Sequence, residues 1–138
     1  MIDSTELIGI EREATSTAEA TILLSRHGIG TYIAAVQVTE LAIGMHLADA
    51  SARARMRADF LELVLRACTV VPFDVAEARE TGRLYAFLRR QGMAIGERDL
   101  QIAATALVHG HEVLTRNVRD FARIPGLKVI DAARVSGS

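Results

Sequence analysis

The stretch that most constrains the fold is residues 96–121, which combine a helical apolar pattern, a glycine and a short β-prone segment. The apolar residues that recur there at helical spacing are Leu100, Ala103, Ala104, Leu107 and Val108. Gly110 is expected to end this helix, because glycine readily adopts the left-handed conformation of a C′ residue. Residues 112–115 then predict a strand. A helix that leads at once into a short apolar strand is typical of an α/β sheet.

The same alternation of strand-like and helical segments runs along the whole chain. The other segments expected to form strands are 1–3, 31–36, 68–71 and 127–130. Helices are expected after Asp3, at 18–26 with a break at 27–30, near Thr39, at 52–67 and at 75–91. Strands that alternate with helices in this way predict a mostly parallel sheet with helices on both faces.

The bulk composition limits the class of protein. The chain has 138 residues, half of them hydrophobic, which suits one domain with a substantial core. We expect that domain to cover 1–135 and a flexible tail to cover 136–138. No apolar run reaches the length of a membrane span. Cys68 is the only cysteine, which excludes an intramolecular disulfide or a multi-cysteine zinc site and favours a cytoplasmic location.

Four acidic residues share one kind of position, because each follows a predicted strand or begins a predicted helix. They are Asp3, Glu40, Asp99 and Asp120. Functional groups gather at the carboxyl ends of parallel strands, so these carboxylates are expected to converge at one edge of the sheet. Clustered carboxylates repel one another unless a hard divalent cation neutralises them, and magnesium prefers such oxygen ligands. The pattern therefore predicts a metal site suited to phosphodiester chemistry.

Each acid also has an ordinary structural interpretation. Asp3 and Asp99 suit helix N-termini, Glu40 suits the first turn of a helix, and Asp120 suits a solvated turn. The net charge of −1 provides no overall basic field for a nucleic acid, so phosphates have to be held locally. The arginines placed to clamp phosphates beside the acids are Arg98, Arg116 and Arg119. The chain has neither a GxGxxG fingerprint nor a P-loop.

Four motifs carry a family resemblance. In chain order they are Asp3-Ser4-Thr5-Glu6-Leu7-Ile8, Val38-Thr39-Glu40-Leu41, Asp99-Leu100-Gln101-Ile102-Ala103-Ala104-Thr105-Ala106 and Thr115-Arg116-Asn117-Val118-Arg119-Asp120-Phe121. Together they resemble the PIN-domain ribonucleases, in particular the VapC-type toxins of toxin–antitoxin pairs. The resemblance covers nearly the whole chain. One departure is the order Ser4-Thr5, where the family has Thr-Ser, and it preserves a hydroxyl near the metal.

The resemblance implies a PIN-like three-layer α/β fold with a central, mostly parallel sheet of about five short strands flanked by helices. It implies that Asp3 and Asp99 are the principal ligands of Mg²⁺, with Mn²⁺ as an alternative metal. The residues implied to complete or support the site are Glu40, Asp120, Asn117 and the hydroxyl of Ser4 or Thr5.

The activity implied is metal-dependent endonucleolytic cleavage of RNA by water, which leaves a 5′-phosphate and a 3′-hydroxyl. The resemblance also implies a homodimer and a VapB-type antitoxin whose tail lies across the acidic groove. Two competing interpretations stay open. The first is a scaffold protein of this fold that has lost catalysis. The second is a metal-dependent DNA nuclease or a phosphatase. Cleavage assays on RNA and DNA, with magnesium or with EDTA, separate them.

Overall fold

The computed structural model describes residues 1–26 and 31–136. The break expected at 27–30 and the last two residues of the expected tail, 137–138, lie outside the described residues. In chain order the elements are α1 (Ser4–Glu13), α2 (Thr17–Ser25), β1 (Tyr32–Ala34), α3 (Ala35–Leu47), α4 (Ser51–Ala67), β2 (Thr69–Val71), α5 (Val75–Arg90), α6 (Glu97–His109), β3 (Val113–Thr115), α7 (Val118–Phe121), β4 (Val129–Asp131) and α8 (Ala132–Ser136). Helix α8 was not predicted, and it includes Ser136, the first residue of the expected tail.

The strands are parallel and short. β1 pairs with β2 and β3 pairs with β4, each over three residues. The N-terminal segment lies between the two pairs, because the Ile2 amide donates to the Tyr32 carbonyl (2.9 Å) and the Asp3 amide donates to the Leu114 carbonyl (2.8 Å). The parallel strands confirm the predicted α/β class. The expected central sheet is instead two strand pairs with the N-terminal segment between them. Ile2 forms a single parallel bridge with Leu114 of β3 and one backbone hydrogen bond to Tyr32 of β1.

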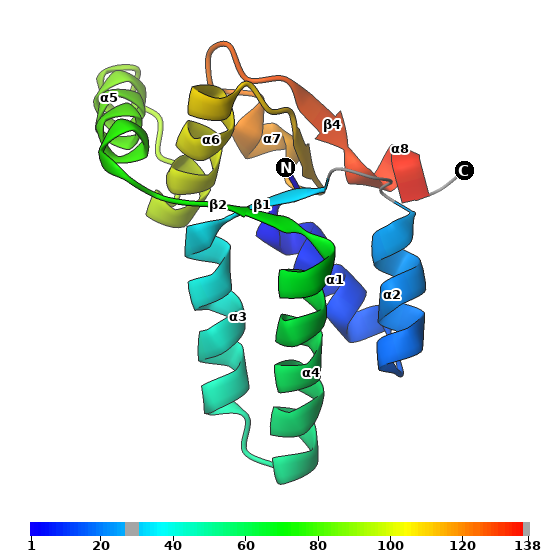
Figure 1. Cartoon of the computed structure of the whole chain (residues 1–138). Coiled ribbons are helices and arrows are strands. Elements are labelled where there is room, and N and C mark those ends of the chain that lie inside the picture. The colour runs from blue at the N-terminus through cyan, green and yellow to red at the C-terminus, as the bar shows by residue number, and fades with distance from the viewer. Residues whose placement is uncertain (27–30, 137–138) are drawn as a thin grey trace.

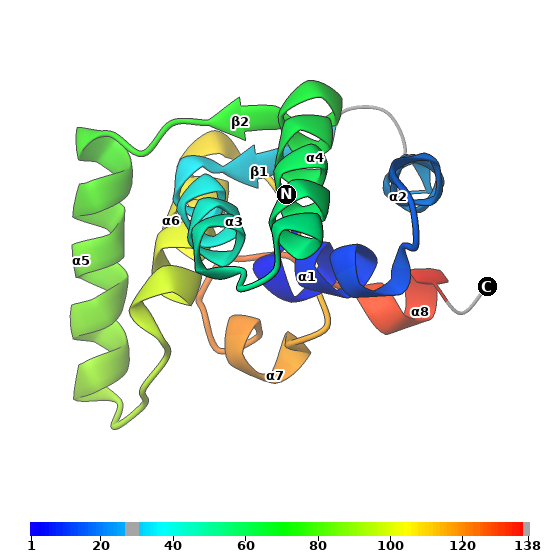
Figure 2. The same ribbon diagram turned by 90° about the horizontal axis from the view of Figure 1, so that it is seen from below.

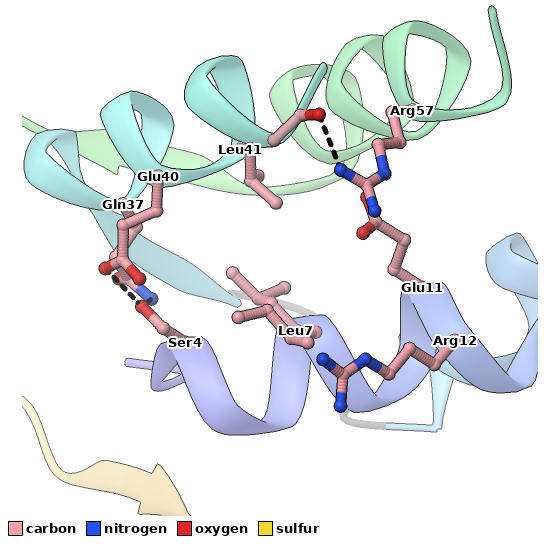
Figure 3. Close-up of a pocket in the computed structure, with 10 residues that line it drawn as sticks. Ser4, Leu7, Glu11, Arg12, Gln37, Glu40, Leu41 and Arg57 are labelled. Carbon is pink, nitrogen blue, oxygen red and sulfur yellow. Dashed lines mark hydrogen bonds between the residues drawn. The ribbon is translucent and has the colours of Figure 1, made fainter. Parts of the chain in front are cut away.

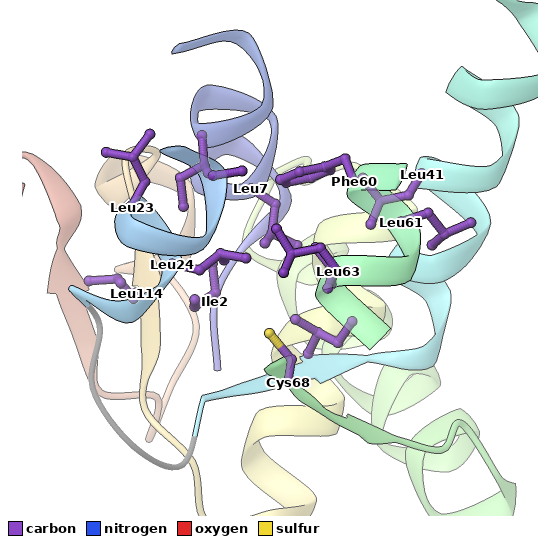
Figure 4. Close-up of a cluster of buried hydrophobic side chains, with 14 of the residues drawn as sticks. Ile2, Leu7, Leu23, Leu24, Leu41, Phe60, Leu61, Leu63, Cys68 and Leu114 are labelled. Atoms are coloured by element: carbon purple, nitrogen blue, oxygen red, sulfur yellow. The ribbon is translucent and has the colours of Figure 1, made fainter. Parts of the chain in front are cut away.

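Helices cover both faces of these strands (Figure 1). Side chains that alternate along a strand point to opposite faces. Ile33 packs into one hydrophobic cluster with α1, α2 and α4, whereas its neighbour Ala34 packs into a second cluster with α5, α6 and α7. Leu114 and Val113 of β3 divide between the two clusters in the same way. The first cluster, which contains Cys68, is drawn in Figure 4. The predicted helices on both faces therefore correspond to two separate cores.

Helix α6 bears out the pattern from which its position was predicted. It runs from Glu97 to His109 and is terminated by Gly110, whose φ of 71° is in the left-handed region. The His111 amide then donates to the Ala106 carbonyl at 2.8 Å, which satisfies a carbonyl at the helix end. Val108 does not belong to the buried face, because 40% of its surface is exposed.

Helix α3 begins earlier than the sequence predicted. Residues 31–36 were expected to form a strand and Thr39 to cap the helix, but the strand ends at Ala34 and the helix follows at once. The reason is the buried side chain of Gln37, whose oxygen accepts from the Ala34 amide at 2.8 Å. Its amide group donates to the Ile2 carbonyl at 2.7 Å. Gln37 thus supplies the polar partner that a helix start needs and ties it to the N-terminal segment.

None of the helices built from the described residues has both the length and the apolar composition that crossing a bilayer demands.

Candidate active site

Asp3 lies at the N-terminus of α1 with no solvent exposure. Its Oδ2 accepts hydrogen bonds from the hydroxyls of Thr5 and Thr115, both at 2.7 Å, and from the Thr5 amide at 3.4 Å. Asp3 therefore is the N-cap of α1, which is the structural role that the sequence allowed. Its other oxygen, Oδ1, is buried without a hydrogen-bond partner in the described part of the chain. A buried carboxylate oxygen without a partner is costly, so this atom is suited to a bound cation.

Glu40 is in the second turn of α3, one turn further along the helix than predicted. Its Oε1 accepts from the Ser4 hydroxyl at 2.7 Å, so one of the predicted supporting hydroxyls contacts an acid of the site. Burial raises the pKa of Glu40, and the charge of Asp3 raises it further. The Ser4 hydrogen bond and the Arg98 guanidinium oppose this rise; Arg98 Nε lies 3.9 Å from Glu40 Oε1.

Asp99, in the first turn of α6, shows that the acids share one electrostatic environment. Its pKa is raised from 3.8 to about 6. Burial is the largest cause, and the charges of Asp3, Asp120 and Glu40 follow in that order. Each of the other three predicted acids is therefore close enough to disfavour the ionised form of Asp99. The convergence expected from the sequence is present in this sense.

The segment after β3 holds the fourth acid. Asn117 Nδ2 donates to Asp120 Oδ2 at 3.0 Å, and Arg123 lies 4.0 Å from Asp120 Oδ1. The Asn117 amide donates to the Thr115 hydroxyl at 2.8 Å, and that same hydroxyl donates to Asp3. Thr115 thus links Asp3 to the Asn117–Asp120 segment. It was not among the predicted site residues, although a hydroxyl at the carboxyl end of a strand was the available signal.

The three predicted phosphate-binding arginines are in different situations. Arg98 lies near Glu40. Arg116 Nε donates to Glu6 Oε2 at 2.7 Å, and the Glu6 side chain is only 3% exposed. Arg119 is exposed, with no ion pair or hydrogen bond of its side chain in the described part of the chain. The guanidinium of Arg116 also packs against Gly9, where an added Cβ would lie 3.2 Å from its Cζ. Arg116 is thus held on α1, whereas the Arg119 side chain extends into solvent.

The side chains gathered here fit a hard cation by their chemistry. Across the residues described, no three acidic, histidine or cysteine side chains already close around one point as a formed metal site. The donors are all carboxylate, hydroxyl and amide oxygens, which suit Mg²⁺ or Mn²⁺ rather than a softer metal. Mg²⁺ keeps several waters and needs only one or two carboxylates. The unpartnered Oδ1 of Asp3, beside three further acids, meets that requirement.

A groove of about 210 Å³ leads away from this acidic site between α1 and α3 (Figure 3). Ser4 and Glu40 line one end of it, and Leu7 and Leu41 form its apolar middle. The charged residues at its other end are Glu11, Arg12 and Arg57. The sequence did not indicate this groove, because its walls come from three helices that are far apart along the chain.

The model of the PIN domain matches residues 1–127 of this chain. Ribonuclease VapC1 of Rickettsia felis is 36% identical over 130 residues, which are 94% of this chain and 93% of that protein. The chain belongs to the PIN-domain VapC ribonucleases. The Ribonuclease VapC of Rickettsia bellii is 32% identical over 130 residues, with the same shares of both chains. The DNA-bound VapBC structure from Salmonella typhimurium superposes on this VapC-family chain with a TM-score of 0.80, at 26% identity and with 96% of each chain covered. The resemblance stated from the four motifs is thereby confirmed.

Proposed function

We propose that this VapC-family chain is a magnesium-dependent endoribonuclease that acts as the toxin of a toxin–antitoxin pair. The observation that carries the metal dependence is the buried, unpartnered Oδ1 of Asp3 beside Glu40, Asp99 and Asp120. The charges of Asp3, Asp120 and Glu40 raise the pKa of Asp99, and this repulsion destabilises the ionised protein without benefit to a scaffold. The same acids are useful to an enzyme that holds a cation.

The chemistry follows from the residues present. Asp3 and Asp99 bind the metal, and Mn²⁺ can replace Mg²⁺. A bound divalent ion lowers the pKa of a coordinated water and neutralises charge on the phosphate. Glu40 and Asp120, held by Ser4 and by Asn117, position water and accept its proton. The phosphorus–O3′ bond breaks as the new phosphorus–oxygen bond forms, and the departing O3′ takes up a proton from solvent water, which leaves a 5′-phosphate and a 3′-hydroxyl.

The experiment that tests this function compares cleavage of single-stranded RNA and DNA of one sequence, with Mg²⁺ and with EDTA. Wild type should cleave RNA only when metal is present. Asp99→Asn should abolish cleavage and keep the fold, because the amide preserves shape but cannot hold the cation. Glu97→Gln, an exposed position in the same helical turn, is the matched control and should retain activity. If Asp99→Asn cleaves RNA at the wild-type rate, Asp99 is not a metal ligand. If wild type cleaves DNA in preference to RNA, the DNA-nuclease alternative is favoured.

An antitoxin is the second part of the proposal. The solved structures from Salmonella typhimurium and from nontypeable Haemophilus influenzae are described as VapBC, which supports a VapB-type partner here. The groove between α1 and α3 suits a segment of that partner, since it ends at Ser4 and Glu40 and combines apolar walls with charges. Co-expression with a small protein encoded beside this gene should yield a complex without ribonuclease activity. The implied homodimer stays a prediction, which light scattering tests.

A further inference from the structure

A second cavity lies where α5 ends and residues 91–96 lead into α6. Its volume is about 310 Å³, at the lower end of the range for small-molecule sites. Tyr85 and Arg89 of α5, Met93 and Ile95 of the connecting segment, and Leu100 of α6 line it. Figure 2 shows α5 beside α6 and the segment that joins them. Tyr85 and Met93 are 49% and 38% exposed, so the cavity opens to solvent.

Tyr85 and Arg89 are arranged as one rigid unit. Arg89 donates from its guanidinium to the Tyr85 hydroxyl at 2.8 Å, and its Cζ lies 5.9 Å from the centroid of the ring. The two residues are four apart on α5 and therefore lie on the same face of the helix. The hydrogen bond favours one orientation of the ring before any ligand arrives. This lowers the conformational entropy that the Tyr85 side chain loses when a ligand stacks on it.

Arg89 also keeps its positive charge available. On the same helix Arg83 is neutralised by Glu80, whereas Arg89 has no acidic partner within the described residues. The cavity contains no carboxylate among its lining residues in that part of the chain. An open, mostly apolar cavity with an aromatic ring and a guanidinium that has no carboxylate partner within the described residues fits a flat ligand that carries a negative charge. An unpaired nucleobase with its phosphate has this chemistry, since bases stack on aromatic and guanidinium planes.

The cavity shares a structural element with the acidic site. Leu100, which lines the cavity, directly follows Asp99 in the first turn of α6. The acidic site and the cavity therefore both adjoin the first turn of α6, so a strand bound at the acids can extend along that turn toward Tyr85. We propose that the Tyr85–Arg89 cavity binds one unpaired nucleobase of the RNA substrate and so fixes where the strand is cut. This inference rests on the proposed ribonuclease function.

The test uses full-length protein and single-stranded RNA octamers that carry 2-aminopurine at one position at a time, in EDTA so that no cleavage occurs. In wild type, stacking on Tyr85 should quench the fluorescence at one position more than at the others. Tyr85→Ala should abolish this position-specific quenching and weaken binding about 5- to 150-fold, the range measured for loss of base stacking. Tyr85→Phe keeps the ring and should keep the quenching. Arg89→Ala should weaken binding and lower its salt dependence.

The control is Arg79→Ala, an exposed arginine of α5 outside the cavity, which should retain wild-type affinity. If Tyr85→Ala binds and quenches as wild type does, while wild type still cleaves RNA with Mg²⁺, the subsite is wrong and the ribonuclease proposal stands. If wild type neither binds nor cleaves RNA, both proposals fail. A change of molecular mass by light scattering in Tyr85→Ala, with unchanged RNA affinity, would show that this face binds a second copy and would overturn the subsite.

Discussion

Removing the charge of Asp99 should stabilise the metal-free protein. A carboxyl whose pKa rises from 3.8 to about 6 on folding destabilises the folded state by about 3 kcal/mol once it is fully ionised, at about 1.4 kcal/mol per pH unit. Asp99 is only partly buried, and water relaxes around it, so we expect about 1–3 kcal/mol in practice. For a domain of 138 residues this corresponds to a rise in Tm of about 3–10 °C in Asp99→Asn.

The effect has a defined pH window. Because the folded-state pKa of Asp99 is raised, the folded state holds more protons than the unfolded state between pH 3.8 and about 6. The free energy of unfolding of wild type should therefore decrease as pH rises through that window, and the loss should be complete above it. Asp99→Asn lacks this dependence. The two proteins should melt at similar temperatures below pH 4 and separate as pH rises to 7, in thermal melts followed by circular dichroism with EDTA.

Magnesium supplies the second half of the test. At ten times its dissociation constant it should stabilise wild type by about 1.4 kcal/mol, and Asp99→Asn should gain less. Glu97→Gln serves as the control, because Glu97 is exposed in the same turn. This substitution should change neither the pH dependence of Tm nor the stabilisation by magnesium. If Asp99 only favours the helix N-terminus, the asparagine variant will instead be less stable by a few tenths to 1 kcal/mol. A less stable variant in EDTA, with equal gains from magnesium, would refute a shared acidic site.

Three further predictions each concern a single side chain. Thr115→Val removes the hydroxyl that donates to Asp3, and should reduce RNA cleavage or metal affinity about 10- to 100-fold, measured by magnesium titration of cleavage rates. Arg116→Ala removes the guanidinium that pairs with the buried Glu6 and should lower the free energy of unfolding in urea by about 0.5–1.5 kcal/mol, less than for a fully buried pair because Arg116 is half exposed. Arg119→Ala should not change stability, but should reduce the salt-dependence slope of RNA binding by about 1; an unchanged slope would exclude a phosphate contact.

Local sequence signals predicted the features whose causes are local. Gly110 ends α6 because the residue directly after the helix adopts a left-handed backbone conformation, which glycine adopts without steric strain. The acids could be located because each follows a strand-like segment or lies near the start of a helix: Asp3 precedes α1, Asp120 follows β3, and Glu40 and Asp99 lie in the first two turns of α3 and α6. The family resemblance rests on these same positions.

Features set by contacts distant in sequence could not be predicted. Gln37 starts α3 early through a hydrogen bond to the Ile2 carbonyl, 35 residues away. Arg116 has the position of a phosphate-binding residue, yet its partner Glu6 is 110 residues distant along the chain. The three-residue strands form two separate pairs rather than one regular sheet, and most residues of both hydrophobic clusters come from the helices that pack on either side. No periodicity within a single segment contains this information.

The distribution of positive charge around the four acids separates them into two pairs. Glu40 and Asp120 each have an arginine within about 4 Å, Arg98 and Arg123 respectively. Asp3 and Asp99 have no such ion pair in the part of the chain that the structure describes, and nothing lowers the pKa of Asp99. A helix cap needs no buried second oxygen, so the burial of Asp3 Oδ1 is not explained by its role in α1. The two acids without a protein cation are therefore the pair that most requires an external one, which supports the proposal that Asp3 and Asp99 hold the metal while Glu40 and Asp120 act on water.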